Sequence, residues 1–273
     1  MKKALVLLLS LLMVFTMFAC GEKVETENKL IFGSSFDYAP FEFMTQDAAG
    51  NMQFTGIDYF VAEEIAKDMG KELQVENMGF DFLMTELSNG NYDMVIAAIE
   101  ATPERLQSAD FSDPYYTDYP PMVLIKKENF DLYKDVADFA GKVVGAQTGT
   151  TKIDLVNSDF VGATPLGEQL VTDLINELSY DKVDAVVLDG AVALQYAAAN
   201  EDLVVANVDL GEAYPYCVAV QKGDPKNLLP SINATIKKLV DGGKVNEFVD
   251  KAEDLLGVAI EWAPYEEGET YQG

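Results

Sequence analysis

The sequence predicts an α/β protein of two lobes, each built around a mostly parallel sheet with helices on its faces. Three observations support this fold class. Short apolar runs that end in turn residues alternate with segments of helical period. The alternation falls into two blocks of about 90 residues each, which is enough for two small lobes. A strand-like run and two helical segments follow the second block as a tail.

The first block contains four predicted strands and two predicted helices. Apolar positions recur at helical spacing from Ile57 to Met69, and Gly70 is typical of a residue that ends a helix, so a helix is expected over 56–70. The run FDFLMTEL predicts a second helix over 80–87. Apolar or alternating runs predict strands at 30–36, 72–78, 92–99 and 122–127.

The second block repeats this organisation. Strands are predicted at 142–147, 183–188 and 203–208, and helices from Thr150, over 168–178 and over 190–200. A single long strand is then predicted at 214–222, followed by helices over 228–240 and 245–252. The last segment, 258–273, contains Pro264 and several Gly and Glu residues without a period, and we expect Trp262 to hold part of it in place.

The amino-terminal segment is predicted to be an export signal. Lys2 and Lys3 precede a continuous apolar run over 4–19, which has the length of a signal-peptide core and is short for a membrane-spanning helix. Cys20 follows directly and resembles the lipidated cysteine of bacterial lipoproteins, although Met17 and Phe18 depart from the usual residues before it. We therefore expect a signal peptide over 1–19, lipidation of Cys20 and a polar tether over 21–28. An uncleaved anchor is the alternative.

Composition excludes several classes of function. The formal net charge of −27 disfavours nucleic acids and anionic lipid surfaces as partners. The chain has no histidine, which removes the commonest general base and the commonest metal ligand, so neither a metal nor a cofactor is expected. Cys217 is the other cysteine and is expected to be a buried apolar residue.

Six sequence blocks, in one order and with plausible spacing, resemble a known family. They are YAPFEF (38–43), GIDYFVAEEIAKDMG (56–70), GNYDMVIAAI (90–99), TPERLQSADFSDPYY (102–116), GKVVGAQTGTT (141–151) and VDAVVLD (183–189). Over about residues 29–255 the chain is similar to the polar amino acid binding proteins of ABC importers, the family 3 solute-binding proteins. Of these blocks, TPERLQSADFSDPYY is the most specific.

The resemblance implies a type II periplasmic-binding-protein-like fold of two lobes joined by two crossing strands. Residues 29–120 and 215–257 would form lobe 1, and residues 121–214 would form an inserted lobe 2. The crossings would lie near Tyr119–Ile125 and Asp209–Tyr216.

The resemblance also implies a site for the two charged groups of a free amino acid. Arg105 would bind the ligand carboxylate in a bidentate fork, together with Thr150 and Thr151 at a helix N-terminus. Asp189, at the carboxyl end of a strand, would bind the ammonium group. A surface ion pair for Arg105 and simple helix capping for Thr150 and Asp189 are the alternatives.

The remaining pocket residues would contact the ligand side chain. Tyr38 and Phe80 match positions where the family places aromatic rings on either side of the ligand, and Ala98 and Gln147 are further candidates. Glu100 departs from the family, which usually has Ser or Thr there. A second negative charge near Asp189 leads to the hypothesis of a cationic ligand such as lysine, arginine or ornithine. Alternatively, Glu100 turns outward or pairs with Arg105.

The implied function is the extracytoplasmic binding component of an amino acid ABC importer, a monomer anchored to the outer face of the cell membrane through Cys20 alone. Its partners would be the amino acid and the importer's permease. Two alternatives remain: a dehydratase-like enzyme on the same fold, with Glu100 as a buried acid, and a ligand-sensing lipoprotein.

Overall fold

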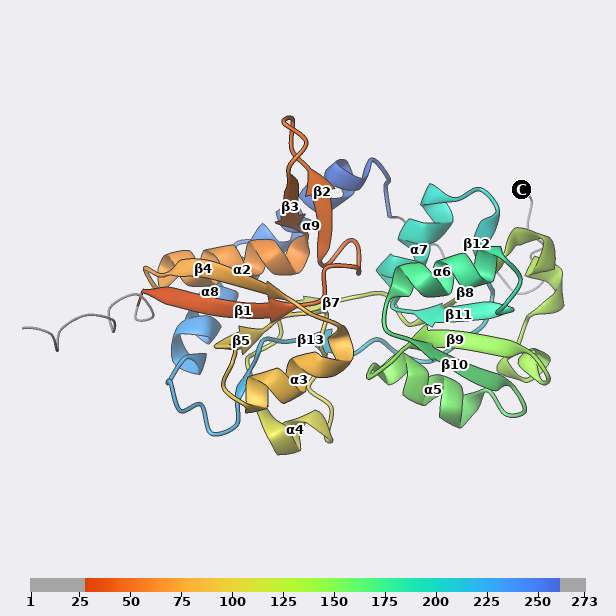
Figure 1. The fold of residues 1–273 in the computed structure, drawn as a ribbon, viewed down its shortest axis with the longest axis horizontal. Coiled ribbons are helices and arrows are strands. Elements are labelled where there is room, and N and C mark those ends of the chain that lie inside the picture. Colours follow the sequence, from red (N-terminus) through yellow and green to blue (C-terminus); the bar gives the residue numbers. More distant parts are fainter. Residues whose placement is uncertain (1–27, 261–273) are drawn as a thin grey trace, which may run out of the picture.

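The computed structural model describes residues 28–260 of the 273-residue chain. The predicted signal peptide, the lipidated Cys20, nearly all of the tether and Trp262 lie outside the described residues. Among the residues described, none of the helices is both long enough and apolar enough to cross a membrane. Figure 1 shows two lobes lying side by side, with the amino-terminal strands and the carboxyl-terminal helices in the same lobe.

Lobe 1 is built on a five-stranded sheet of order β4-β1-β5-β14-β6. Strand β1 is parallel to β4 and to β5, whereas β14 is antiparallel to β5 and β6. An antiparallel hairpin of β2 and β3 projects beside this sheet. The strands are β1 (Lys29–Ser34), β2 (Phe43–Gln46), β3 (Met52–Thr55), β4 (Glu72–Asn77), β5 (Met94–Val95), β6 (Ala109–Phe111) and β14 (Ala219–Gln221).

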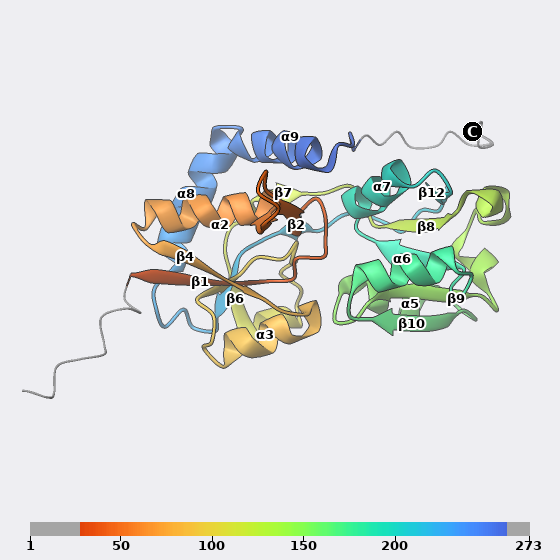
Figure 2. The same cartoon turned by 45° about the horizontal axis from the view of Figure 1, so that its top comes forward.

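Helices cover both faces of this sheet. On one face, α2 (Ile57–Asp68) packs against α8 (Leu229–Asp241) and α9 (Lys244–Leu256). On the other face lie α3 (Phe80–Ser88) and the short α4 (Arg105–Ser108). Figure 2 shows these two layers on opposite sides of β1. Apolar residues of α2 at positions 57, 60, 61 and 65 are buried, which is the helical spacing that the sequence predicted.

Lobe 2 has a second five-stranded sheet, of order β10-β9-β11-β8-β12. Strands β9, β10 and β11 are mutually parallel, and β8 is antiparallel to both β11 and β12. Its strands are β8 (Met122–Lys126), β9 (Val143–Gln147), β10 (Thr164–Glu168), β11 (Ala185–Leu188) and β12 (Leu203–Val205). One face carries α6 (Val171–Ser179) and α7 (Gly190–Ala199). The other carries α5 (Thr151–Asp159) and the 3-10 turns η1 (Lys127–Leu132) and η2 (Val136–Phe139).

Two segments connect the lobes and pair with each other. Strand β7 (Tyr116–Thr117) leads into lobe 2, and β13 (Pro215–Tyr216) leads back, and the two are antiparallel neighbours. Figure 1 places this pair between the lobes. Paired connections of this kind suit a hinge, because two short segments can absorb a rotation of one lobe against the other.

The fold class predicted from the sequence is confirmed, and three details of the prediction are wrong. The long strand expected at 214–222 is two strands, because β13 pairs with β7 whereas β14 joins the sheet of lobe 1. The strand expected at 92–99 is regular only in β5, since the chain then turns at Ala98, where φ is 45°. The helix predicted over 168–178 begins at Val171, because Glu168 ends β10.

Candidate functional site

A small enclosed cavity lies where the two lobes meet. Nine residues line it: Tyr38, Phe80, Ala97, Ala98, Glu100, Gln147, Thr150, Lys152 and Asp189. Seven of them are site residues predicted from the sequence. Its free volume is about 10 Å³, far below the volume of an amino acid. The two lobes are therefore closed against each other, and the side chains of the protein itself fill the space between them.

Arg105, in α4 of lobe 1, binds Glu100 and reaches across to lobe 2. Its Nη1 donates to a carboxylate oxygen of Glu100 at 2.6 Å and to the Glu100 carbonyl at 3.1 Å. Its Nη2 donates to the carbonyl oxygen of Gly149 at 3.1 Å, and its guanidinium carbon lies 5.4 Å from the centre of the Phe80 ring. Glu100 thus binds one of the two guanidinium nitrogens of Arg105 that the sequence analysis predicted to bind a ligand carboxylate.

Lys152 connects the two acidic residues of the cavity. Its Nζ is 2.8 Å from Oε1 of Glu100 and 2.6 Å from Oδ1 of Asp189. All three side chains are almost fully buried. Burial alone would raise the pKa of Glu100, but the charges of Lys152 and Arg105 lower it to about 2. Glu100 is therefore a carboxylate at neutral pH.

Asp189 lies at the N-cap position of α7, but its side chain caps nothing. Its Oδ2 accepts a hydrogen bond from the Tyr38 hydroxyl at 2.7 Å, across the lobe boundary. Burial, followed by the nearby charge of Asp189, raises the pKa of Tyr38 well above its usual value, so the phenol remains a donor. The chain therefore uses Asp189 to connect the lobes rather than to begin a helix.

Thr150 and Thr151 have different roles at the start of α5. Thr150 is the N-cap: its hydroxyl accepts from the amide of Ile153 and donates to the carbonyl of Gln147. The Thr151 hydroxyl donates to Oε1 of Glu100 at 2.8 Å, from lobe 2 to lobe 1. The side-chain amide of Gln147 donates to the carbonyl of Gln169.

A buried acid pair lies behind the cavity wall at Ala98. The amide of Ala98 donates to Oδ2 of Asp58 at 2.6 Å, and the hydroxyl of Tyr115 donates to Oδ1 at 2.6 Å. Glu42 adjoins Asp58, and neither of its carboxylate oxygens accepts a hydrogen bond from the described residues. Burial raises the pKa of Asp58 to about 6, and burial together with Asp58 raises that of Glu42 well above its usual value.

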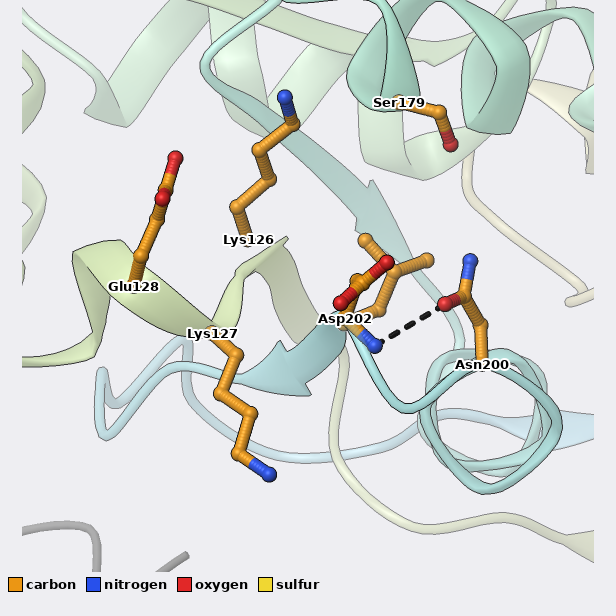
Figure 3. A pocket seen from close by; sticks show the side chains of 7 residues that line it. Lys126, Lys127, Glu128, Ser179, Asn200 and Asp202 are labelled. Atoms are coloured by element: carbon orange, nitrogen blue, oxygen red, sulfur yellow. Dashed lines mark hydrogen bonds between the residues drawn. The ribbon is translucent and has the colours of Figure 1, made fainter.

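A larger hollow on lobe 2 does not share this chemistry. It has a volume of about 650 Å³ and is lined by residues 126–128, Ser179, Asn200, Asp202 and Leu203. Figure 3 shows that Lys127 points away from Lys126 and Ser179, while the backbone amide of Asp202 donates to the side-chain oxygen of Asn200. Its side chains do not converge on a common point. Over residues 28–260 no cluster of three acidic or sulfur side chains has the geometry to hold a metal ion.

The sequence reasoning missed Lys152. A lysine in the first turn of a helix usually lies in solvent, and nothing in its local pattern distinguished it. The available signal was Glu100, because a carboxylate buried beside Asp189 requires a cation. Lys152 supplies that cation, which changes the charge balance assumed by the hypothesis of a cationic ligand.

Comparison with known proteins gives a consistent result. The family model of bacterial extracellular solute-binding proteins, family 3, matches residues 30–252. The chain is 31% identical to the arginine-binding extracellular protein ArtP of Bacillus subtilis over 257 residues, 92% of this chain and 98% of ArtP. It is 31% identical to a probable histidine-binding protein of Campylobacter jejuni over 232 residues, 84% of this chain and 85% of that protein.

Solved structures agree. The structure of an amino acid ABC transporter substrate-binding protein, AbpA from Streptococcus pneumoniae, bound to L-arginine, superposes with a TM-score of 0.81 at 30% identity. The match covers 88% of this chain and 99% of AbpA. Sequence and fold thus lead to the same group of proteins.

Proposed function

Because the chain belongs to the bacterial extracellular solute-binding proteins of family 3, we propose that it captures a free amino acid outside the cytoplasm and delivers it to an ABC importer. One observation carries the proposal: Asp189 of lobe 2 lines the cavity between the lobes, and Arg105 of lobe 1, whose side chain is 11% exposed, lies beside that cavity and binds its lining residue Glu100. An amino acid carries the two charges that complement them.

The closed cavity suggests how the ligand enters. Polar contacts join the lobes at the cavity, among them Tyr38 with Asp189, Thr151 and Lys152 with Glu100, and Arg105 with the carbonyl of Gly149. Separation of the lobes exposes both charged groups to water. An amino acid then binds, and the lobes close over it, with its carboxylate at Arg105 and Thr151 and its ammonium at Asp189. Tyr38 and Phe80 contact its side chain.

Among the amino acids, arginine, lysine and ornithine are the first to test, because ArtP and AbpA are named for or bound to arginine. Glu100 supports binding rather than catalysis. A general acid must hold a proton at the working pH, whereas the pKa of Glu100 is lowered to about 2. We therefore propose that the protein binds its ligand without converting it.

The proposal includes the cellular location. A signal peptide over 1–19 and lipidation of Cys20 would hold the protein at the outer face of the cell membrane, with residues 21–28 as tether. One chain contains both halves of the site, so a monomer suffices. The Cys20→Ser variant is expected to appear in the culture medium, whereas the unaltered protein stays with the membrane fraction. Release of both proteins in equal amounts would refute the anchor.

Thermal unfolding of the purified protein with each of the twenty amino acids, ornithine and citrulline tests the function. A ligand that binds only the folded state adds about 2.7 kcal/mol of stability at a hundredfold excess over its Kd. We expect one small group of amino acids to raise the unfolding midpoint. Arg105→Ala, as the matched control, is expected to abolish this rise. If no amino acid raises the midpoint, the proposal is wrong.

A further inference from the structure

Lys152 is a buried cation that the two-charge recognition of an amino acid does not require. Its side chain is 5% exposed, and it lies in the first turn of α5, where the positive end of the helix dipole disfavours a cation. The two carboxylates on either side of it offset that cost. A lysine retained in such a position constrains what else can bind there.

The charges around the cavity cancel. Glu100 and Asp189 contribute two negative charges, and Arg105 and Lys152 contribute two positive charges. A zwitterionic amino acid keeps this balance, because its carboxylate and ammonium add one charge of each sign. A second positive charge on the ligand finds no unpaired carboxylate among these residues. Removal of Lys152 would leave an excess of one negative charge, and removal of Glu100 would leave an excess of one positive charge.

We propose that Lys152 and Glu100 together determine the charge selectivity of the pocket: Glu100 favours a cationic ligand side chain, and Lys152 limits that preference by pairing with Glu100. The inference rests on the proposed function, since it concerns the amino acid bound at that site. In the closed conformation the Lys152 ammonium also occupies the position beside Asp189 that the ligand ammonium needs, so the ligand must displace it. Lys152 then keeps Glu100 as its partner.

Arginine and citrulline provide the matched ligand pair, because they have nearly the same shape and differ by one positive charge. The measured quantity is the ratio of their affinities from titration calorimetry. We expect Lys152→Gln to raise the arginine-to-citrulline ratio about tenfold, equivalent to about 1.4 kcal/mol. Glu100→Gln is expected to lower the ratio by a similar factor. The double variant is expected to return to within about threefold of the unaltered protein. Where the unaltered protein binds only shorter side chains, lysine and glutamine replace the pair.

Two controls separate the possible causes. Lys182→Gln removes the same charge from lobe 2 at a side chain that is 65% exposed, and it should leave the ratio unchanged. Lys134→Gln makes the same change at a second lobe 2 side chain, 41% exposed, and should also leave the ratio unchanged. If Lys152→Gln does not fold, Glu100→Gln decides: a lowered ratio supports the proposal, and an unchanged ratio overturns it. Unchanged ratios in both single variants overturn the inference while leaving the proposed function intact. Absence of binding by the unaltered protein instead refutes the proposed function.

Discussion

Glu42 and Asp58 should make the stability of this protein depend on pH, and Glu42→Gln should remove the part of that dependence that the Glu42 proton contributes. Glu42 is 1% exposed, and without a proton its oxygens would face Asp58 with no donor. A protonated Glu42 can donate a hydrogen bond to the Asp58 carboxylate. The two oxygens of that carboxylate also accept hydrogen bonds from the Ala98 amide and the Tyr115 hydroxyl. Glutamine has the same shape and supplies an N–H donor without taking up a proton.

The size of the effect follows from proton linkage. A carboxyl whose pKa is raised in the folded state stabilises that state at low pH and loses this contribution as pH rises. For Glu42 the window opens at its usual pKa of 4.5 and extends upward from there, because burial and the neighbouring Asp58 raise the pKa of Glu42 in the folded state. One extra proton in the folded state changes the free energy of unfolding by about 1.4 kcal/mol per pH unit. Between pH 5 and pH 7.5 the limit is therefore about 3 kcal/mol.

Urea unfolding at half-unit steps from pH 5 to pH 7.5 measures this slope. The free energy of unfolding of the unaltered protein should fall more steeply with pH than that of Glu42→Gln. The two slopes should differ by up to the amount that corresponds to one bound proton, about 1.4 kcal/mol per pH unit. Glu63→Gln makes the same change at an exposed position in α2 and should follow the unaltered protein. Parallel curves for Glu42→Gln and the unaltered protein would refute a shared proton.

Three further variants test the closed interface. Arg105→Ala should weaken amino acid binding by at least about 100-fold, because the carboxylate loses its charged partner. Calorimetry checks this, with exposed Lys237→Ala as the charge-matched control. Tyr38→Phe loses a hydrogen bond to the carboxylate of Asp189, typically worth about 1.5–3 kcal/mol, and should weaken binding at least about tenfold in the same assay. Gly149→Ala places a Cβ 3.0 Å from a backbone atom of α3 at a φ of 76°, so the lobes should stay apart. Small-angle scattering with saturating ligand should then give the larger radius of gyration, and full compaction would refute that steric argument.

The strands that were predictable from the sequence are those buried on both sides. Every residue of β11 is buried, and its apolar run stands out without knowledge of its neighbours. Strand β10 was not predicted because its sequence is TPLGE, with a proline and a glycine, and it lies at the sheet edge, where such residues are tolerated. The break between β13 and β14 depends on which strands they pair with, and that is a tertiary property.

In the candidate site, too, local features were predictable from the sequence whereas tertiary contacts were not. Sequence blocks predicted Arg105, Thr151 and Asp189 as site residues, because each motif contains its own residue. The pairing among them was not predictable, since Glu100 and Lys152 are 52 positions apart and meet only when the lobes close. An unusual acidic residue in a motif indicates that a compensating cation exists but not where it lies.

The polar character of the interface explains how a small ligand could control closure. The polar contacts that cross between the lobes near the cavity include Tyr38 to Asp189, Thr151 and Lys152 to Glu100, Arg105 to Gly149, the amide of Val171 to Asp37, and Gln169 to Asp81. Each is replaced by water when the lobes part, so its net contribution is about 0.5–1.5 kcal/mol, or up to about 3 for the charged pairs. Their sum is comparable to the roughly 8 kcal/mol that a micromolar ligand provides. A ligand that substitutes its own carboxylate and ammonium for these internal partners can therefore determine whether the lobes remain closed.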